Sequence, residues 1–201
     1  MRRKLKKRAD RRRWAAAQTL PELADLMARW LEGELSMWPG YDEGASEETA
    51  ALIPTLAAAN RGGFLTDQSQ PGFDGRGFDG LRWEQRAAVT GLVVDEELLT
   101  RIRRAGEAAG LLVLISHPRL LPQGNGVTGT IRGGQPYTVF GEYAPPQHLR
   151  HIWSGVSRPA LDAVTDAWQV ALIDPAYGRN DRLWPLLDGL FAAHPATTRE
   201  D

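Results

Sequence analysis

The segment from residue 86 to residue 116 constrains the fold more than any other part of the chain. Residues 86–94 and 111–116 are apolar and rich in β-branched side chains, which is typical of strands. Between them, Asp95 is expected to cap a helix that begins with acidic residues and ends at Gly110. A strand, a helix and a second strand in succession predict a sheet covered by helices, which is an α/β architecture.

The rest of the chain adds helices before this unit and mixed elements after it. Thr19 begins a helix with a capping box. Ser46 begins a second helix over residues 46–60, which Pro54 is expected to kink, and a long glycine-rich connection follows a short extended piece at 63–66. We therefore expect a single α/β domain with a mixed β-sheet flanked by helices. The later elements are strands at 137–143 and 168–174, and helices at 147–153, 158–167 and 182–193.

Charge is divided between a short basic segment and an acidic body. Residues 1–13 hold nine basic residues and one acidic residue, whereas residues 14–201 hold 15 basic and 24 acidic residues. We expect residues 1–13 to be a flexible arm, because they have too few apolar side chains to offset the entropy of ordering, and residues 14–201 to be one domain. Such an arm can bind the phosphates of nucleic acid, but the acidic body argues against a broad nucleic-acid surface on the domain.

Composition excludes several classes of protein. Without cysteine, the chain has no disulfide framework, thiol nucleophile or zinc ribbon. No apolar stretch is long enough for a membrane helix, and the basic N-terminal run lacks the apolar region of a secretory signal. We therefore expect a cytoplasmic protein with no membrane partner.

Three short motifs match chemical patterns only weakly. Residues 124–129 match G-x-G-x-x-G, but the glycines and proline after them prevent the helix that a dinucleotide site requires. His148 and His151 can share a helix face, yet no third ligand is nearby in the sequence, so exposed or capping histidines are favoured over a metal site. The Asp-Gly pairs at 74–75 and 79–80 are typical of turns rather than of a calcium loop.

No motif in the sequence identifies a catalytic centre. A Ser-His-Asp set, a paired-carboxylate motif, a P-loop and an HExxH motif are all missing, so we expect a protein that is not an enzyme. An enzyme that uses the same pocket is an alternative for which no nucleophile or general base can be named. Trp38 and Trp83 lie in or beside predicted loops, where an aromatic face can stack on a purine or lie against a cation.

Three blocks of sequence carry a family resemblance. Residues 48–53 read Glu-Thr-Ala-Ala-Leu-Ile, residues 60–71 read Asn-Arg-Gly-Gly-Phe-Leu-Thr-Asp-Gln-Ser-Gln-Pro, and residues 83–87 read Trp-Glu-Gln-Arg-Ala. Together they resemble the C-terminal regulatory domain of eukaryotic methylenetetrahydrofolate reductase, and the resemblance extends less specifically over residues 20–193. That domain binds S-adenosylmethionine as an allosteric inhibitor. The resemblance therefore implies the same fold and S-adenosylmethionine or S-adenosylhomocysteine as ligand.

The resemblance also implies where the ligand would bind. The Gly62-Gly63 turn can return the loop at 66–71 to the start of the helix at 46–60, which predicts a pocket between them. Hydroxyls and loop N–H groups suit the ligand carboxylate, and Glu48 suits its ammonium or ribose. The same residue types also suit helix capping and turns, so a purely structural role is the alternative. The implied ligand-binding residues are Glu48, Thr49, Thr66, Ser69, Thr128 and Thr138.

Departures from the family pattern limit what the resemblance implies. Pro54 interrupts the helix, and Asp67-Gln68 replaces a small polar or apolar pair. The regulatory-like domain fills the 201 residues, which leaves no room for the folate- and flavin-binding barrel, so reductase activity is not carried over. We expect a stand-alone, non-catalytic sensor or regulator that binds the adenosyl ligand and acts on a protein partner. The alternative is a nucleic-acid-associated protein that acts through residues 1–13.

Overall fold

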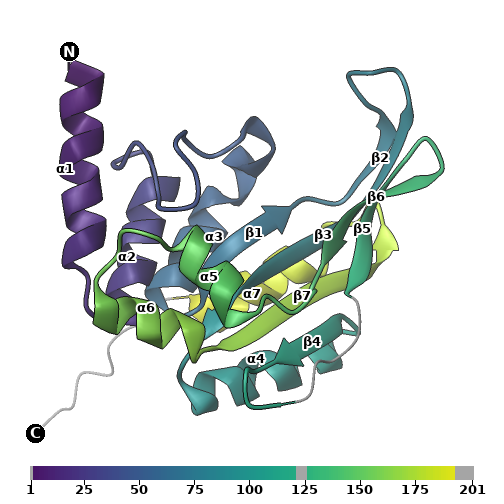
Figure 1. Cartoon of the computed structure of the whole chain (residues 1–201). Helices are drawn as coiled ribbons and strands as arrows, with labels where there is room; N and C mark the ends of the chain where they lie inside the picture. Colours follow the sequence, from purple (N-terminus) through teal and green to yellow (C-terminus); the bar gives the residue numbers. More distant parts are fainter. Residues whose placement is uncertain (1, 121–125, 193–201) are drawn as a thin grey trace, which may run out of the picture.

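The chain folds into an antiparallel sheet with helices gathered around one end of the sheet (Figure 1). The structure is a computed structural model, and it describes residues 2–120 and 126–192. The described strands are β1 (Leu65–Gln70), β2 (Phe73–Arg76), β3 (Arg82–Val93), β4 (Leu112–Ser116), β5 (Val127–Arg132), β6 (Gln135–Phe140) and β7 (Trp168–Tyr177). They are ordered β4-β7-β3-β5-β6, and β1 and β2 also pair with β3.

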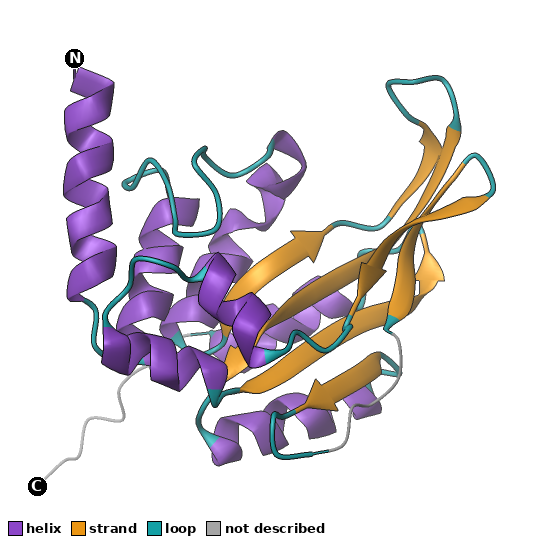
Figure 2. Ribbon diagram, in the orientation of Figure 1, coloured by secondary structure: helices purple, strands orange, loops and turns teal. Residues whose placement is uncertain are grey.

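The central strand β3 is long enough to serve two parts of the sheet. Its second half pairs with β1 and β7, and its first half pairs with β2 and β5. A register shift between Arg86 and Ala88 separates the two halves on the β7 side, as expected where a strand bends. The first half therefore extends away from the helices together with the β5–β6 hairpin (Figure 2).

Helices cover both faces of the sheet around the second half of β3. They are α1 (Arg2–Ala16), α2 (Leu20–Leu31), the 3-10 helix η1 (Glu47–Leu52), α3 (Ile53–Arg61), α4 (Glu96–Ala108), α5 (Pro146–Ile152), α6 (Arg158–Thr165) and α7 (Leu183–Phe191). α4 approaches the sheet so closely that a Cβ at Gly106 would lie 2.7 Å from Val113 and 3.1 Å from Leu172. Because neighbouring strand residues point to opposite faces, Leu114 and Ala171 face the other side, where α5 lies.

The helix starts predicted from local sequence form in the structure. The Thr19 hydroxyl accepts a hydrogen bond from the Glu22 amide at 3.3 Å, and the Glu22 carboxylate accepts one from the Gln18 amide at 2.6 Å. The Asp95 carboxylate accepts hydrogen bonds from the amides of Glu97 and Leu98 at the start of α4. The predicted strand, helix and strand of residues 86–116 are therefore confirmed.

Residues 2–16 form one helix, so the expected boundary between residues 13 and 14 falls inside α1. Asp10 is fully buried, and its carboxylate accepts hydrogen bonds from the Ser36 amide at 2.9 Å and the Ser36 hydroxyl at 2.6 Å. Trp14 is buried against Trp153, with 6.2 Å between ring centroids. These contacts join α1 to the rest of the fold, while the flexibility expected of residues 1–13 stays a prediction.

The single α/β domain with a sheet flanked by helices is confirmed, with three differences in detail. The described strand pairs are antiparallel rather than mixed, because β7 lies between β3 and β4 and runs opposite to both. Pro54 lies in the first turn of α3, where its missing N–H costs nothing, so the expected kink is replaced by the junction of η1 and α3. The connections expected to be irregular contain β2, β5 and most of β1.

Candidate functional site

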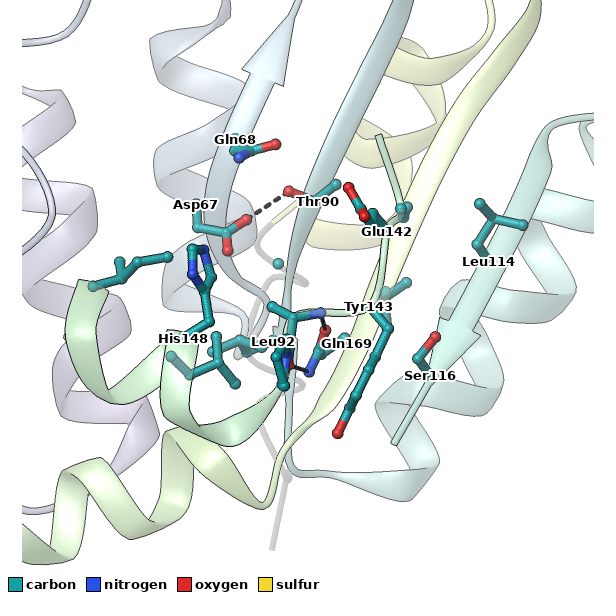
Figure 3. Close-up of a pocket in the computed structure, with 18 of the residues that line it drawn as sticks. Asp67, Gln68, Thr90, Leu92, Leu114, Ser116, Glu142, Tyr143, His148 and Gln169 are labelled. Carbon is teal, nitrogen blue, oxygen red and sulfur yellow. Dashed lines mark hydrogen bonds between the residues drawn. The ribbon is translucent and has the colours of Figure 1, made fainter. Parts of the chain in front are cut away.

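Two cavities share a wall at Asp67, Gln68 and Val139, which line both of them. The helix-side cavity, of about 560 Å³, is enclosed by α2, residues 38–49, β1 and β6. The sheet-face cavity, of about 310 Å³, lies between the sheet, residues 141–145 and α5 (Figure 3). Small-molecule sites usually have volumes of about 300–1,000 Å³, so each cavity is large enough for a ligand or part of one.

One wall of the helix-side cavity is aromatic. Trp30 and Trp38 line it, with an edge-to-face geometry and 6.3 Å between their ring centroids, and Tyr41 lies beside them. The Trp30 indole N–H donates a hydrogen bond to the Glu43 carbonyl at 2.9 Å, which holds the ring in place. A fixed aromatic wall of this kind suits a flat apolar group such as a purine.

Several hydroxyl groups also line the helix-side cavity. The hydroxyls of Ser46 and Thr49 are 2.9 Å apart. The Thr66 hydroxyl accepts a hydrogen bond from the buried Asn60 amide at 2.7 Å, which leaves its own proton free to donate. The Thr138 hydroxyl is buried, and no described residue forms a hydrogen bond with it. A buried hydroxyl without a partner is costly, and such a group often points to a bound molecule or water.

Four of the six sequence-predicted residues line the helix-side cavity, namely Thr49, Thr66, Ser69 and Thr138. Glu48 is exposed and does not line it, because three residues complete one turn of a 3-10 helix, so Ser46 and Thr49 share a face that Glu48 does not. Thr128 is opposite Val139 in the β5–β6 pair and does not line the cavity either. Ser69, expected in a loop, lies in β1. The predicted pocket between the start of the second helix and residues 66–71 is therefore present, without Glu48.

The sheet-face cavity was not predicted from the sequence. Its floor comes from β3, β4 and β7, where Thr90, Ser116 and Gln169 supply polar groups among apolar side chains. The Gln169 side chain donates to the Ala144 carbonyl at 2.7 Å and accepts from the Ala144 amide at 2.8 Å. This pair of bonds fastens residues 141–145 to the sheet and so shapes the cavity wall, which also carries Tyr143.

Asp67 is the charged residue at the junction of the two cavities. A register shift between Thr66 and Gln68 gives β1 a bulge at Asp67, and bulges redirect side chains. The Thr90 hydroxyl donates a hydrogen bond to the Asp67 carboxylate at 2.6 Å (Figure 3). Burial raises the pKa of the Asp67 carboxyl, and the Thr90 hydrogen bond opposes that shift. The sequence signal for this residue was its departure from the small polar or apolar pair of the family pattern.

Asp67→Asn is expected to raise the free energy of unfolding at neutral pH. The folded protein holds the Asp67 proton more tightly than the unfolded chain, so the stability of the wild-type protein falls as pH rises from the unfolded to the folded pKa. Asparagine removes the buried charge and keeps an oxygen that can accept from Thr90. Urea denaturation of both proteins at about pH 7 and about pH 3.5 measures their free energies of unfolding. The variant should have the higher value only at about pH 7. If wild-type protein and variant have equal free energies of unfolding at both pH values, the Asp67 carboxylate is well solvated.

Comparison with known proteins places the chain in a family of unassigned function. A model of a domain of unknown function, DUF6919, matches residues 9–194. The chain belongs to this family. Over 62 residues, or 31% of the chain, it is also 36% identical to Methylenetetrahydrofolate reductase 1 of Schizosaccharomyces pombe. The matched segment covers 10% of that protein, so the two share only part of their length.

The DUF6919 region contains both cavities and the buried part of α1. All residues that line either cavity fall within it. It begins before Asp10 and Trp14, the side chains that anchor α1 to the core. The family region therefore includes residues 9–13, which belong to the segment expected to form a flexible arm.

The described residues of the weaker sequence motifs in this DUF6919 domain lie in or beside β5, α5 and β3. Gly124 and Asn125 lie outside the described residues, and residues 127–129 form the start of β5 rather than of a helix. His148 lines the sheet-face cavity, and the described residues contain no cluster of three or more side chains able to hold a metal ion. Trp83 lies away from both cavities, with the Arg132 guanidinium 5.5 Å from its ring centroid.

Within the described part of the chain, no helix combines the length and the apolar character needed to cross a membrane.

Proposed function

We propose that this domain binds S-adenosylmethionine or S-adenosylhomocysteine in the helix-side cavity and acts as a non-catalytic sensor or regulator. The observation that carries the proposal is that Thr49, Thr66, Ser69 and Thr138, which all have hydroxyl side chains, line one cavity that also has an aromatic wall. These hydroxyls come from three separate parts of the chain. The partial identity to a methylenetetrahydrofolate reductase supports the choice of ligand class.

The chemistry of the cavity matches the parts of an adenosyl ligand. The aromatic wall of Trp30, Trp38 and Tyr41 offers a surface for the adenine. Hydroxyl groups in this cavity can exchange hydrogen bonds with the ribose hydroxyls. The Thr138 hydroxyl is buried and has no partner among the described residues, so a rotation of its side chain toward a ligand would give it one.

Thr138→Val is expected to weaken binding about tenfold without lowering stability. Valine has nearly the shape of threonine, and the hydroxyl it replaces has no partner among the described residues, so the folded protein loses no hydrogen bond. Calorimetry with S-adenosylmethionine, S-adenosylhomocysteine and adenosine measures the affinity, and thermal unfolding measures stability. Product analysis of the same samples should show no turnover.

The matched control is Thr100→Val, which makes the same change on α4, where the side chain lines neither cavity. This control should bind as the wild-type protein does. Loss of melting temperature in Thr138→Val with unchanged affinity would support a structural role for Thr138. Wild-type protein that shows no heat of binding with any of the three compounds at millimolar concentration would refute the proposed function.

A further inference from the structure

Asp67 occupies a position that the proposed function leaves unexplained. It lines both cavities. A molecule that extended from one cavity into the other would therefore have its central part beside Asp67. The bulge at Asp67 is what brings it there, because a regular strand would alternate residues 66, 67 and 68 between the two faces of the sheet. A carboxylate on a half-buried strand position is unusual and calls for a chemical reason.

The Asp67 carboxylate has no fixed cation beside it. The Thr90 hydroxyl is neutral, and no described lysine or arginine contributes to its charge environment. The titratable groups that share the sheet-face cavity are Glu142 and Tyr143 from the segment after β6 and His148 from α5 (Figure 3). Glu142 and His148 are exposed to water, which screens charge, whereas Asp67 is half-buried. The local field at the junction is therefore set mainly by Asp67.

An uncompensated carboxylate between two cavities suits a ligand whose positive charge lies at its centre. S-adenosylmethionine has that form, because its sulfonium lies between the adenosine and the amino-acid end. A sulfonium donates no N–H or O–H hydrogen bond, so a protein recognises it by charge, and a partly desolvated carboxylate interacts with a cation more strongly than an exposed one. S-adenosylhomocysteine has a neutral thioether at the same place.

We propose, building on the proposed function, that Asp67 faces the sulfonium and makes the domain select S-adenosylmethionine over S-adenosylhomocysteine. The adenosine then lies in the helix-side cavity and the amino-acid end in the sheet-face cavity. There, Gln169 is already bonded to Ala144, while Ser116, Tyr143 and His148 supply polar groups for a carboxylate and an ammonium. The destabilising burial of Asp67 is explained as a requirement of ligand selection rather than of folding.

The test compares the affinities of wild-type protein and Asp67→Asn for the two ligands by calorimetry. Wild-type protein should bind S-adenosylmethionine more tightly. The variant should lose about tenfold or more in affinity for S-adenosylmethionine and less than about twofold for S-adenosylhomocysteine. Glu107→Gln is the matched control, because it removes one negative charge from the exposed side of α4, outside both cavities, and it should change neither affinity.

Three results would overturn the inference. Equal losses for the two ligands would place Asp67 against a group that they share, and equal affinities in variant and wild type would place it outside the site. Wild-type protein without preference for S-adenosylmethionine would also contradict it. Failure of the proposed function is distinguished because wild-type protein would then bind neither ligand. Thermal unfolding checks that Asp67→Asn is folded, and Asp67→Ser provides a second neutral variant.

Discussion

Trp153→Ala should lower the free energy of unfolding by about 3–5 kcal/mol. The Trp153 indole is fully buried, and its ring centroid lies 6.2 Å from that of Trp14 and 5.2 Å from that of Trp38. Trp14 belongs to α1, and Trp38 belongs to the wall of the helix-side cavity, so the indole joins elements that are distant in sequence. Alanine would leave a cavity at this position, because other contacts prevent the surrounding elements from moving together to fill it. Urea denaturation followed by circular dichroism measures the change.

The matched control is Trp153→Phe. The indole N–H of Trp153 is buried and has no hydrogen-bond partner among the described residues, so phenylalanine removes an unsatisfied donor while keeping an aromatic ring. This variant should lose less than half as much stability as Trp153→Ala. Equal losses would show that the protein depends on the second ring of the indole, and no loss in either variant would contradict the central packing role of Trp153.

Removal of residues 1–13 should lower the free energy of unfolding by about 2–4 kcal/mol. This result is the opposite of what the low apolar content of the segment predicts. The truncation removes Asp10, whose buried carboxylate accepts hydrogen bonds from the Ser36 amide, the Ser36 hydroxyl and the Arg13 guanidinium. It also removes most of α1 and so exposes Trp14. Denaturation of the full chain and of a chain that begins at residue 14 measures the difference.

Two point variants separate the contribution of Asp10 from that of the basic residues. Asp10→Ala should reproduce much of the loss, because it leaves the Ser36 groups without their acceptor. Arg12→Ala should have little effect, because the Arg12 side chain is exposed and forms no hydrogen bond or ion pair with the described residues. A truncated protein as stable as the full chain would support the flexible arm instead. The same truncated protein tests the nucleic-acid alternative, in which binding is salt-sensitive and requires residues 1–13.

The candidate site was predicted in part because its residues belong to one short stretch. Thr49, Thr66 and Ser69 are close in sequence, and the glycine turn brings β1 back to the start of the helix. Thr138 was assigned by resemblance, and it lines the same cavity. Asp67 was noticed as a departure from the pattern, but its position between two cavities depends on a bulge that the sequence does not reveal.

Local sequence alone determined the helix starts, the strand–helix–strand unit and the α/β class. Thr19 and Asp95 cap their helices because a cap needs only residues within one turn. The apolar runs of β3 and β4 likewise indicate strands without reference to their partners.

Only the tertiary structure decided which strands pair and which polar side chains become buried. β7 follows β3 and β4 by many residues in the sequence but pairs with both of them. The Gln70 side chain in β1 donates a hydrogen bond to the Gly129 carbonyl, 59 residues away. Asp10 is buried because Ser36 supplies donors from outside α1, although every pattern in its own segment predicts exposure. Such choices depend on the energy of contacts between distant residues, whereas composition and periodicity describe only neighbours along the chain.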